Sequence, residues 1–164
     1  MKQAFSLSPF EAIVRPEWID SNGHMNLAYY VVVFDLATDV LYDHLGIGIP
    51  YREATGNSCF TAETHILYER EVKLGDRLLV HTRLLDADSK RLLYFHEMFH
   101  ADEGYRACVQ ELISLHVDLA IRRTVPFPAE QQAMIDACLQ ETAGRPFPPE
   151  AGRRIAMPAR NNAP

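Results

Sequence analysis

Between Arg15 and Gly46 the chain passes from a polar turn to a strongly apolar segment. Apolar residues recur in that segment at steps of three and four, which indicates one face of a helix. They are Leu27, Tyr30, Val31, Phe34, Ala37, Leu41 and Leu45, and beside them runs a second apolar row of Tyr29, Val33, Leu36 and Val40. A helix this apolar must be covered by other structure over most of its surface. The pattern therefore predicts a central helix from residue 27 to about residue 45, capped by Asn26 and ended by Gly46.

From residue 57 onward the hydrophobic period changes to two, which is the period of a β-strand. Short polar turns separate four such segments, and we expect strands over residues 57–68, 78–85, 91–101 and 107–119. In the first strand, the alternation places Phe60, Ala62, Thr64, Ile66 and Tyr68 on one face and Thr61, Glu63, His65 and Leu67 on the other. The remaining pattern predicts a first strand at 9–15, a connection with one helical turn at 47–57, and a short helix at 128–141.

The predicted order, one strand, a long helix and an antiparallel meander, is an α+β arrangement. A single sheet can hide the long helix only by curling around it, and it still leaves one side of the helix uncovered. We therefore expect one domain over residues 1–142 that assembles as a homodimer, with a tetramer left open. The proline-rich tail over residues 143–164 is expected to be poorly ordered unless a partner subunit holds it.

Charge and cysteine content narrow the class of protein. The formal net charge is -6 and the chain has no basic tract, which argues against nucleic acid as a partner. No segment is long and apolar enough to predict a membrane span. The three cysteines, an odd number, suit a reducing compartment better than a disulfide framework. We expect a cytoplasmic protein.

The polar turn carries the motif Asp20-x-Asn22-x-His24-x-Asn26, which ends three residues before Tyr29. Together with the element order over roughly residues 8–122, this motif resembles the hotdog-fold acyl-CoA thioesterases of the 4-hydroxybenzoyl-CoA thioesterase type. The segment Y-E-R-E-V-K-L-G-D, residues 68–76, is similar to the strand–turn–strand passage of that family. The resemblance implies the hotdog fold, a long central helix wrapped by a curled antiparallel sheet. It also implies hydrolysis of an acyl-CoA with no cofactor, since coenzyme A is part of the substrate.

Five further segments resemble a narrower group, the thioesterases of bacterial carnitine breakdown, which cleave betainyl-CoA and occur alone or fused to carnitine dehydrogenase. The segments are W-I-D-S-N-G-H-M-N, F-D-L-A-T-D, F-T-A-E-T-H, K-R-L-L-Y-F-H and L-H-V-D. This narrower resemblance implies a short acyl group, with betainyl-CoA hydrolysed to betaine and CoA.

In the family, an acidic residue at the position of Asp20 attacks the thioester or activates water against it. The chemistry is consistent with that role, because a thioester needs an oxygen nucleophile and donors for the developing oxyanion, while its thiolate leaves readily. Asp20 can act as nucleophile or general base, and Asn22 and His24 can orient water. Free N–H groups at the helix start, near Asn26, can bind the oxyanion. The same residues also suit an ordinary turn and helix cap, but their order before this helix favours catalysis.

Other candidates have an ordinary structural explanation beside the functional one. Glu63 is a candidate second carboxylate that a partner subunit would bring to the helix start, or else it lies on a solvated strand face. Candidates for the acyl pocket are Trp18, Tyr29, Tyr30 and Phe60, with Thr61 as a weaker polar contact, and most of these would equally serve as core. Candidates for the phosphates of coenzyme A are Lys90, Arg91, Arg122 and Arg123, which would equally be solvated charges at turns.

Two alternative functions remain open. His96-Glu97-x-x-His100 matches the H-E-x-x-H signature of zinc proteases, which suggests a zinc-dependent hydrolase. That signature works only on a helix, whereas the flanking residues alternate with period two, and histidines four residues apart on a strand are separated by about 13 Å. We therefore expect no metal at this segment. The second alternative is a dimer that binds an acyl ligand without cleaving it.

Overall fold

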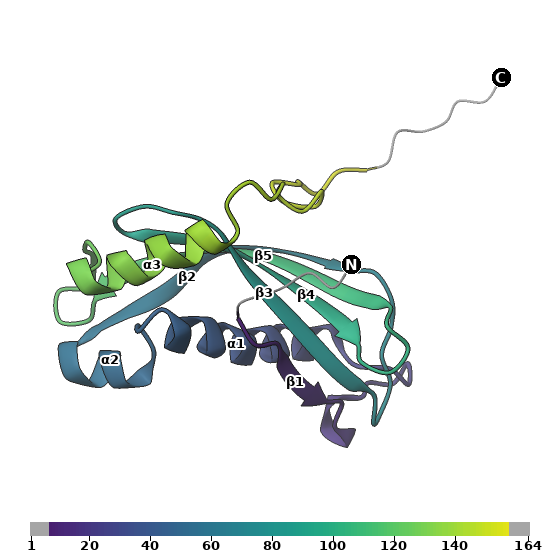
Figure 1. The fold of residues 1–164 in the computed structure, drawn as a ribbon. Helices are drawn as coiled ribbons and strands as arrows, with labels where there is room; N and C mark the ends of the chain where they lie inside the picture. The colour runs from purple at the N-terminus through teal and green to yellow at the C-terminus, as the bar shows by residue number, and fades with distance from the viewer. Residues whose placement is uncertain (1–6, 158–164) are drawn as a thin grey trace.

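A long helix, α1 (Leu27–His44), packs against one side of a single antiparallel sheet (Figure 1). The structure is a computed structural model, and it describes residues 7–157. The sheet runs in the order β1-β3-β4-β5-β2, and a two-residue strand, β6, pairs with β5. The strands are β1 (Phe10–Ile13), β2 (Asn57–Tyr68), β3 (Arg77–Ala87), β4 (Arg91–His100), β5 (Arg106–Asp118) and β6 (Arg123–Thr124). The remaining elements are a short 3₁₀ helix, η1 (Pro16–Trp18), and the helices α2 (Ile49–Thr55) and α3 (Ala129–Glu141).

The predicted central helix is present with the predicted cap. The side chain of Asn26 accepts a hydrogen bond from the backbone N–H of Ala28 at 3.0 Å. The helix ends at His44, and Gly46 follows with a φ of 66°. A side chain at Gly46 would collide with Met134 of α3, since a Cβ there would lie 2.9 Å from the methionine sulfur. The glycine therefore provides the left-handed turn after α1, with Met134 of α3 packed close to it.

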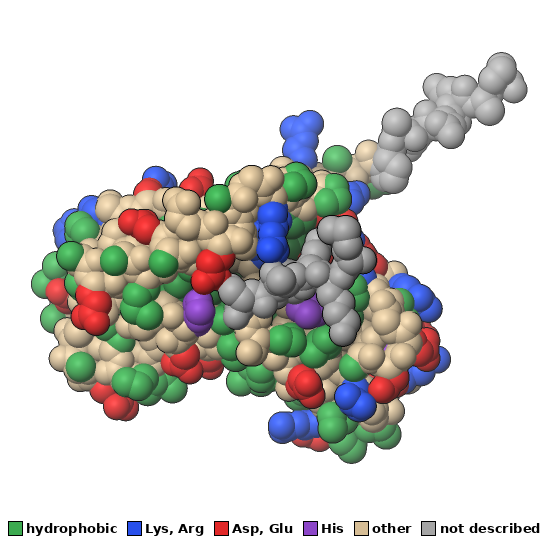
Figure 2. All heavy atoms as spheres, viewed as in Figure 1, with side chains coloured by type: hydrophobic (Ala, Val, Ile, Leu, Met, Phe, Trp, Pro, Cys, Tyr) green, Lys and Arg blue, Asp and Glu red, His purple; other side chains and the backbone are tan. Residues whose placement is uncertain are grey.

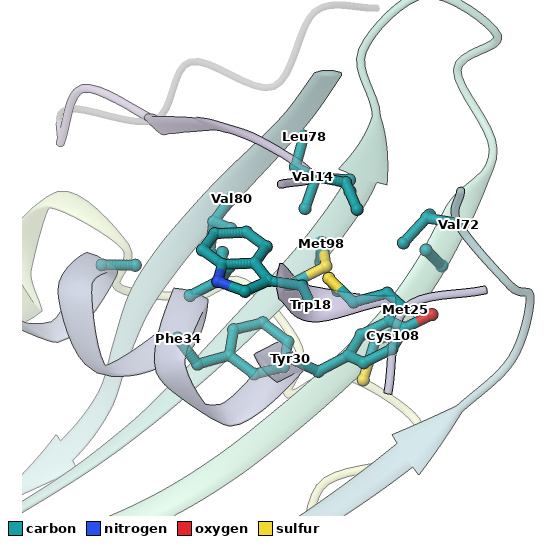
Figure 3. Close-up of a cluster of buried hydrophobic side chains, with 13 residues drawn as sticks. Val14, Trp18, Met25, Tyr30, Phe34, Val72, Leu78, Val80, Met98 and Cys108 are labelled. Atoms are coloured by element: carbon teal, nitrogen blue, oxygen red, sulfur yellow. The ribbon is translucent and has the colours of Figure 1, made fainter. Parts of the chain in front are cut away.

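Two groups of buried side chains hold α1 against the sheet. The group around the start of the helix includes Trp18, Met25, Tyr30, Phe34 and Met98 (Figure 3). The group around its end joins α1 to α3 and to the sheet through Leu41, Leu45, Leu84, Tyr94 and Ile135. Both ends of α1 are therefore fixed relative to the sheet.

Not all of the apolar surface of α1 is buried. The sheet covers one side of the helix, and Leu27, Val31 and Leu36 remain 63%, 38% and 41% exposed in the single chain. This is the uncovered side that the apolar pattern predicts for one copy of the domain.

The faces of β2 differ from those predicted. The pairing of β2 with β5 shifts between Thr61 and Glu63, so Ala62 is an extra residue in the strand and forms a β-bulge. The opposing pairs are Phe60 with Leu115, Thr61 with Ser114, Glu63 with Ile113 and Tyr68 with Cys108. Ser114 and Cys108 are fully buried on the side of α1, so Thr61 and Tyr68 face the helix. Phe60 and Glu63 face the opposite, outer side. The prediction that Phe60 and Tyr68 share a face is wrong because the bulge reverses the alternation.

The outer face of the sheet is partly covered by the chain's own C-terminal segment. The guanidinium group of Arg83 donates hydrogen bonds to the carbonyl groups of residues 145 and 146 at 2.9 and 2.8 Å. Glu111 accepts a hydrogen bond from the N–H of Gly152 at 2.8 Å, and Arg106 forms an ion pair with Glu150. Residues 145–152, part of the tail that was expected to need a partner subunit, are therefore held by the sheet of the same chain. Residues 158–164 lie outside the described part.

The surface carries charged side chains of both signs. On the face shown in Figure 2, basic and acidic side chains are interspersed rather than gathered by sign. Within residues 7–157, no helix has the length and apolar character needed to cross a membrane. Cys59, Cys108 and Cys138 are free thiols.

Candidate active site

The motif Asp20 to Asn26 forms a tight turn that leads directly into α1. The backbone N–H of Asp20 donates to the carbonyl of His24 at 3.1 Å, and the N–H of Gly23 donates to the carbonyl of Asp20 at 3.0 Å. Gly23 has a φ of 80°, a conformation that glycine adopts without strain. The carboxylate of Asp20 accepts the N–H of Asn22 at 2.8 Å, which fixes the direction of the carboxylate.

The turn is anchored at both of its ends. The N–H of Met25 donates to the carbonyl of Val72 at 2.9 Å, and the N–H of Asn26 donates to the carbonyl of Trp18 at 2.9 Å. Met25 is 1% exposed, so the turn is held by packing as well as by hydrogen bonds. These contacts keep Asp20 at a fixed position just before the first turn of α1.

The first turn of α1 offers one backbone donor. The N–H groups of Asn26, Ala28 and Tyr29 bond to the Trp18 carbonyl, the Asn26 side chain and the Asn26 carbonyl. Within the described part of the chain, this leaves the N–H of Leu27 as the unpaired donor of the first turn. An oxyanion beside Leu27 would also be stabilised by the positive end of the helix dipole.

His24 lies between the carboxylate of Asp20 and a small pocket. Its Nδ1 atom is 3.9 Å from Asp20 Oδ1 and 3.3 Å from the carbonyl oxygen of Met25. The side chains of Asp20 and His24 are 21% and 33% exposed, so water and substrate can reach both. The arrangement allows Asp20 to act on a carbonyl carbon, or on a water molecule that His24 helps to orient.

The pocket beside His24 has a volume of about 220 Å³. Its lining comes from the turn, the first helical turn, the end of β2 and the loop that follows it. The lining residues are His24, Met25, Leu27, Tyr30, Tyr68, Glu69, Arg70 and Glu71. A small acyl group bound at the helix start would therefore meet two tyrosines, two carboxylates and one guanidinium group.

The predicted pocket residues occupy three different environments. Tyr30 lines the pocket, and burial raises its pKa to about 12, so it is an uncharged phenol. Trp18 is 6% exposed, with the Tyr29 ring stacked at 5.6 Å and the Arg15 guanidinium 5.3 Å from its ring centre. Phe60 lies on the outer face of β2, away from this pocket.

Tyr68 is a pocket residue that sequence reasoning did not select. Its hydroxyl donates to the carbonyl of Leu27 at 3.3 Å, and its ring meets that of Tyr30 edge to face at 5.3 Å between ring centres. The signal available in the sequence was its place at the end of the strand. The bulge at Ala62 turns Phe60 to the outer side of the sheet, whereas Tyr68 stays on the helix side.

The candidate phosphate contacts lie at the other end of the molecule. Arg91 is the first residue of β4 and lies beside the end of β5. The other end of β4, at His100, lies next to the start of β3 and the polar turn. All four candidates are exposed, namely Lys90, Arg91, Arg122 and Arg123, and Arg91 pairs with Asp88. In one chain they are separated from Asp20 by about the length of α1, roughly 27 Å for 18 residues. Thr61 and Glu63, in the middle of β2, also do not line the pocket beside His24.

The H-E-x-x-H segment lies on strand β4, as predicted, and not on a helix. His96 is fully buried and hydrogen-bonded to Thr38 and Thr82 at 3.0 and 2.8 Å. His100 instead accepts the backbone N–H groups of Asp102 and Glu103. Glu97 faces the outer side and pairs with Arg106. The described residues contain no group of three or more metal-binding side chains. The geometry therefore does not support the zinc-hydrolase alternative.

A larger cavity of about 840 Å³ lies on the outer face of the sheet, beneath the C-terminal segment. Its lining combines apolar side chains such as Phe95, Phe99 and Phe147 with His81 and Arg83. None of the turn residues or the first residues of α1 contributes to it. The smaller pocket, and not this cavity, is lined by residues of the turn that carries the candidate catalytic carboxylate.

A curled antiparallel sheet around a long helix, with a carboxylate-bearing turn at the helix start, defines the hotdog class of thioesterases. The model of the thioesterase-like superfamily matches residues 14–135. The chain belongs to this superfamily.

Relatives of known name and structure agree with that membership. The chain is 40% identical over 152 residues to a betainyl-CoA thioesterase of Pseudomonas aeruginosa, covering 93% of this chain and 96% of that protein. It is 41% identical to an L-carnitine dehydrogenase/betainyl-CoA thioesterase of Agrobacterium fabrum, of which it spans 31%. A Staphylococcus aureus protein solved in complex with CoA superimposes with a TM-score of 0.84 at 29% identity, over 92% of this chain and 94% of that one.

Proposed function

We propose that this thioester hydrolase of the thioesterase-like superfamily cleaves betainyl-CoA to betaine and CoA. The observation that carries the proposal is the Asp20 turn, fixed at the start of α1 beside a pocket of about 220 Å³ with aromatic and acidic lining. The 40% identity to a betainyl-CoA thioesterase over 93% of the chain supports the same substrate. The cytoplasm suits an enzyme with three free thiols.

In this proposal, Asp20 begins the reaction in one of two ways. Its carboxylate attacks the thioester carbonyl carbon, CoA leaves as a thiolate, and water then hydrolyses the acyl anhydride. In the other route Asp20 removes a proton from a water molecule that attacks the same carbon. In both routes the carbonyl oxygen becomes negatively charged, and the N–H of Leu27 and the helix dipole stabilise it. The thiolate is a good leaving group, so neither route needs a strong general acid.

A homodimer would complete the site. β2 ends the sheet, and its second edge has no partner strand among residues 7–157. Antiparallel pairing of two β2 strands gives one continuous sheet and satisfies twelve residues of exposed edge. It also places the far end of one chain beside the helix start of the other. Exposed cations would then lie near each catalytic turn, where the CoA phosphates need them; they are the partner copies of Lys90, Arg91, Arg122 and Arg123.

The substrate assignment is tested with a matched pair of esters. Betainyl-CoA and tert-butylacetyl-CoA have nearly the same shape, but only the first carries a positive charge. With two aromatic contacts, from Tyr30 and Tyr68, of about 0.5–2 kcal/mol each, we expect kcat/KM to be at least about fivefold higher for betainyl-CoA. The measurement is the release of free thiol under steady-state conditions. An equal or lower kcat/KM for betainyl-CoA would exclude this substrate, and no thiol from either ester would favour a ligand-binding dimer without catalysis.

A further inference from the structure

The acyl group of betainyl-CoA is very short, and this restricts where its charge can be bound. A single CH₂ group separates the thioester carbonyl from the trimethylammonium group. If the carbonyl oxygen lies at the N–H of Leu27, the cation must therefore lie beside the first turn of α1, among the residues that surround that turn. The pocket beside His24 is at that position, because Leu27 and Tyr30 are part of its lining.

The contacts of Tyr68 hold its ring in place and leave part of the ring open to a ligand. It is 48% exposed although its ring packs edge to face on Tyr30, so part of its surface is open. Its hydroxyl donates to the carbonyl of Leu27 at 3.3 Å, the residue whose N–H faces the reacting carbonyl in the proposed mechanism. The ring is therefore tied to the catalytic helix start through one residue.

The charged side chains around the pocket are paired, so the aromatic rings carry the selection of a cation. Glu69 and Glu71 line it together with Arg70, and both carboxylates are in ion pairs, Glu69 with Arg106 at 2.7 Å and Glu71 with Lys73 at 3.2 Å. A trimethylammonium group has no N–H to donate, so it is bound best by aromatic surface near negative charge.

We infer that Tyr68, packed on Tyr30, is the residue that makes this site select a cationic acyl group over a neutral one of the same shape. The inference rests on the proposed function. Trp18 does not fill this role, because Tyr29 and Arg15 occupy its ring faces, and Phe60 lies on the outer side of β2.

The experiment measures the ratio of kcat/KM for betainyl-CoA to kcat/KM for tert-butylacetyl-CoA in four proteins. Tyr68→Leu removes the ring, and we expect this ratio to fall roughly threefold to thirtyfold, the range of one cation–π contact. Tyr68→Phe keeps the ring but loses the hydrogen bond to Leu27, and its ratio should stay within about threefold of that of the wild type. Phe60→Leu, which removes another exposed ring of the same strand, should leave the ratio unchanged. Thermal melting of each variant checks that it is folded.

The outcomes separate this inference from the proposed function. A wild-type ratio of one or less overturns both. A high wild-type ratio that survives in Tyr68→Leu overturns only the role of Tyr68. Equal losses in Tyr68→Leu and Tyr68→Phe would mean that the hydroxyl acts by positioning Leu27, and a loss in Phe60→Leu alone would place the cation elsewhere. Either result contradicts the inference.

Discussion

At the scale of single residues, His96 stays uncharged because it is enclosed between α1 and the sheet. The hydroxyl of Thr38 donates to the Phe34 carbonyl, so it accepts from Nε2 of His96, and Nδ1 then accepts the hydroxyl of Thr82. The imidazole also stacks on Phe34 at 5.4 Å between ring centres. Burial lowers its pKa from 6.5 to about 3. Both nitrogens are satisfied in the neutral form, and a metal ion would have to displace two hydrogen bonds.

This burial predicts a pH-dependent loss of stability. The folded-state pKa lies below the unfolded one, so the unfolded chain binds a proton first, and stability falls as the pH drops from about 6.5 towards 3. His96→Gln can keep bonds to both threonines without titrating. Between about pH 6.5 and pH 4.5 we expect the wild type to lose roughly 2–3 kcal/mol more unfolding free energy than His96→Gln. Urea unfolding at the two pH values measures this, and parallel losses in the two proteins would contradict it.

At the scale of elements, the sequence was sufficient for regular patterns and insufficient for irregular ones. The helix α1 is predicted by the regular spacing of its apolar residues, by Asn26 at its start and by Gly46 after its end. The motif at Asp20 locates the turn before it. The bulge at Ala62 could not be predicted, because the residues around it are exposed and mostly polar, and thus give no apolar alternation to interrupt. That one extra residue turns Phe60 to the outer side of the sheet and Thr61 to the helix side, the reverse of the predicted alternation.

The C-terminal segment is a second feature that the sequence pattern could not predict. Its prolines and polar residues are typical of a disordered tail. The contacts that hold it come from Arg83 on β3 and from Arg106 and Glu111 on β5, which come together only after the sheet has formed. A local pattern cannot show such contacts. The outer-face cavity beneath the segment is a consequence of the same docking.

At the scale of the whole molecule, one chain leaves apolar surface and a strand edge uncovered. Leu27, Val31, Leu36 and Phe60 are each more than a third exposed, and the free edge of β2 runs for twelve residues. An edge of this length is rarely left open, because it invites pairing with another chain. Pairing through β2 would satisfy the edge and bring the basic end of one copy to the catalytic turn of the other.

We therefore predict a homodimer at minimum. Light scattering at micromolar concentration should give at least twice the chain mass of 18.6 kDa. The active species should have that mass across the concentrations used for kinetics. An 18.6 kDa species with full thioesterase activity would show that one chain is sufficient and would refute the proposed arrangement.

The most direct test of the catalytic turn is thiol release from betainyl-CoA by Asp20→Asn. Asparagine has nearly the same shape and can still accept the N–H of Asn22, so the turn should fold normally. The loss of the carboxylate charge removes both the nucleophile and the base, and we expect kcat to fall by about a hundredfold to ten-thousandfold. Asp136→Asn, on the exposed side of α3, is the matched control and should keep wild-type activity. A folded Asp20→Asn protein that hydrolyses betainyl-CoA at the wild-type rate would contradict the role of this turn.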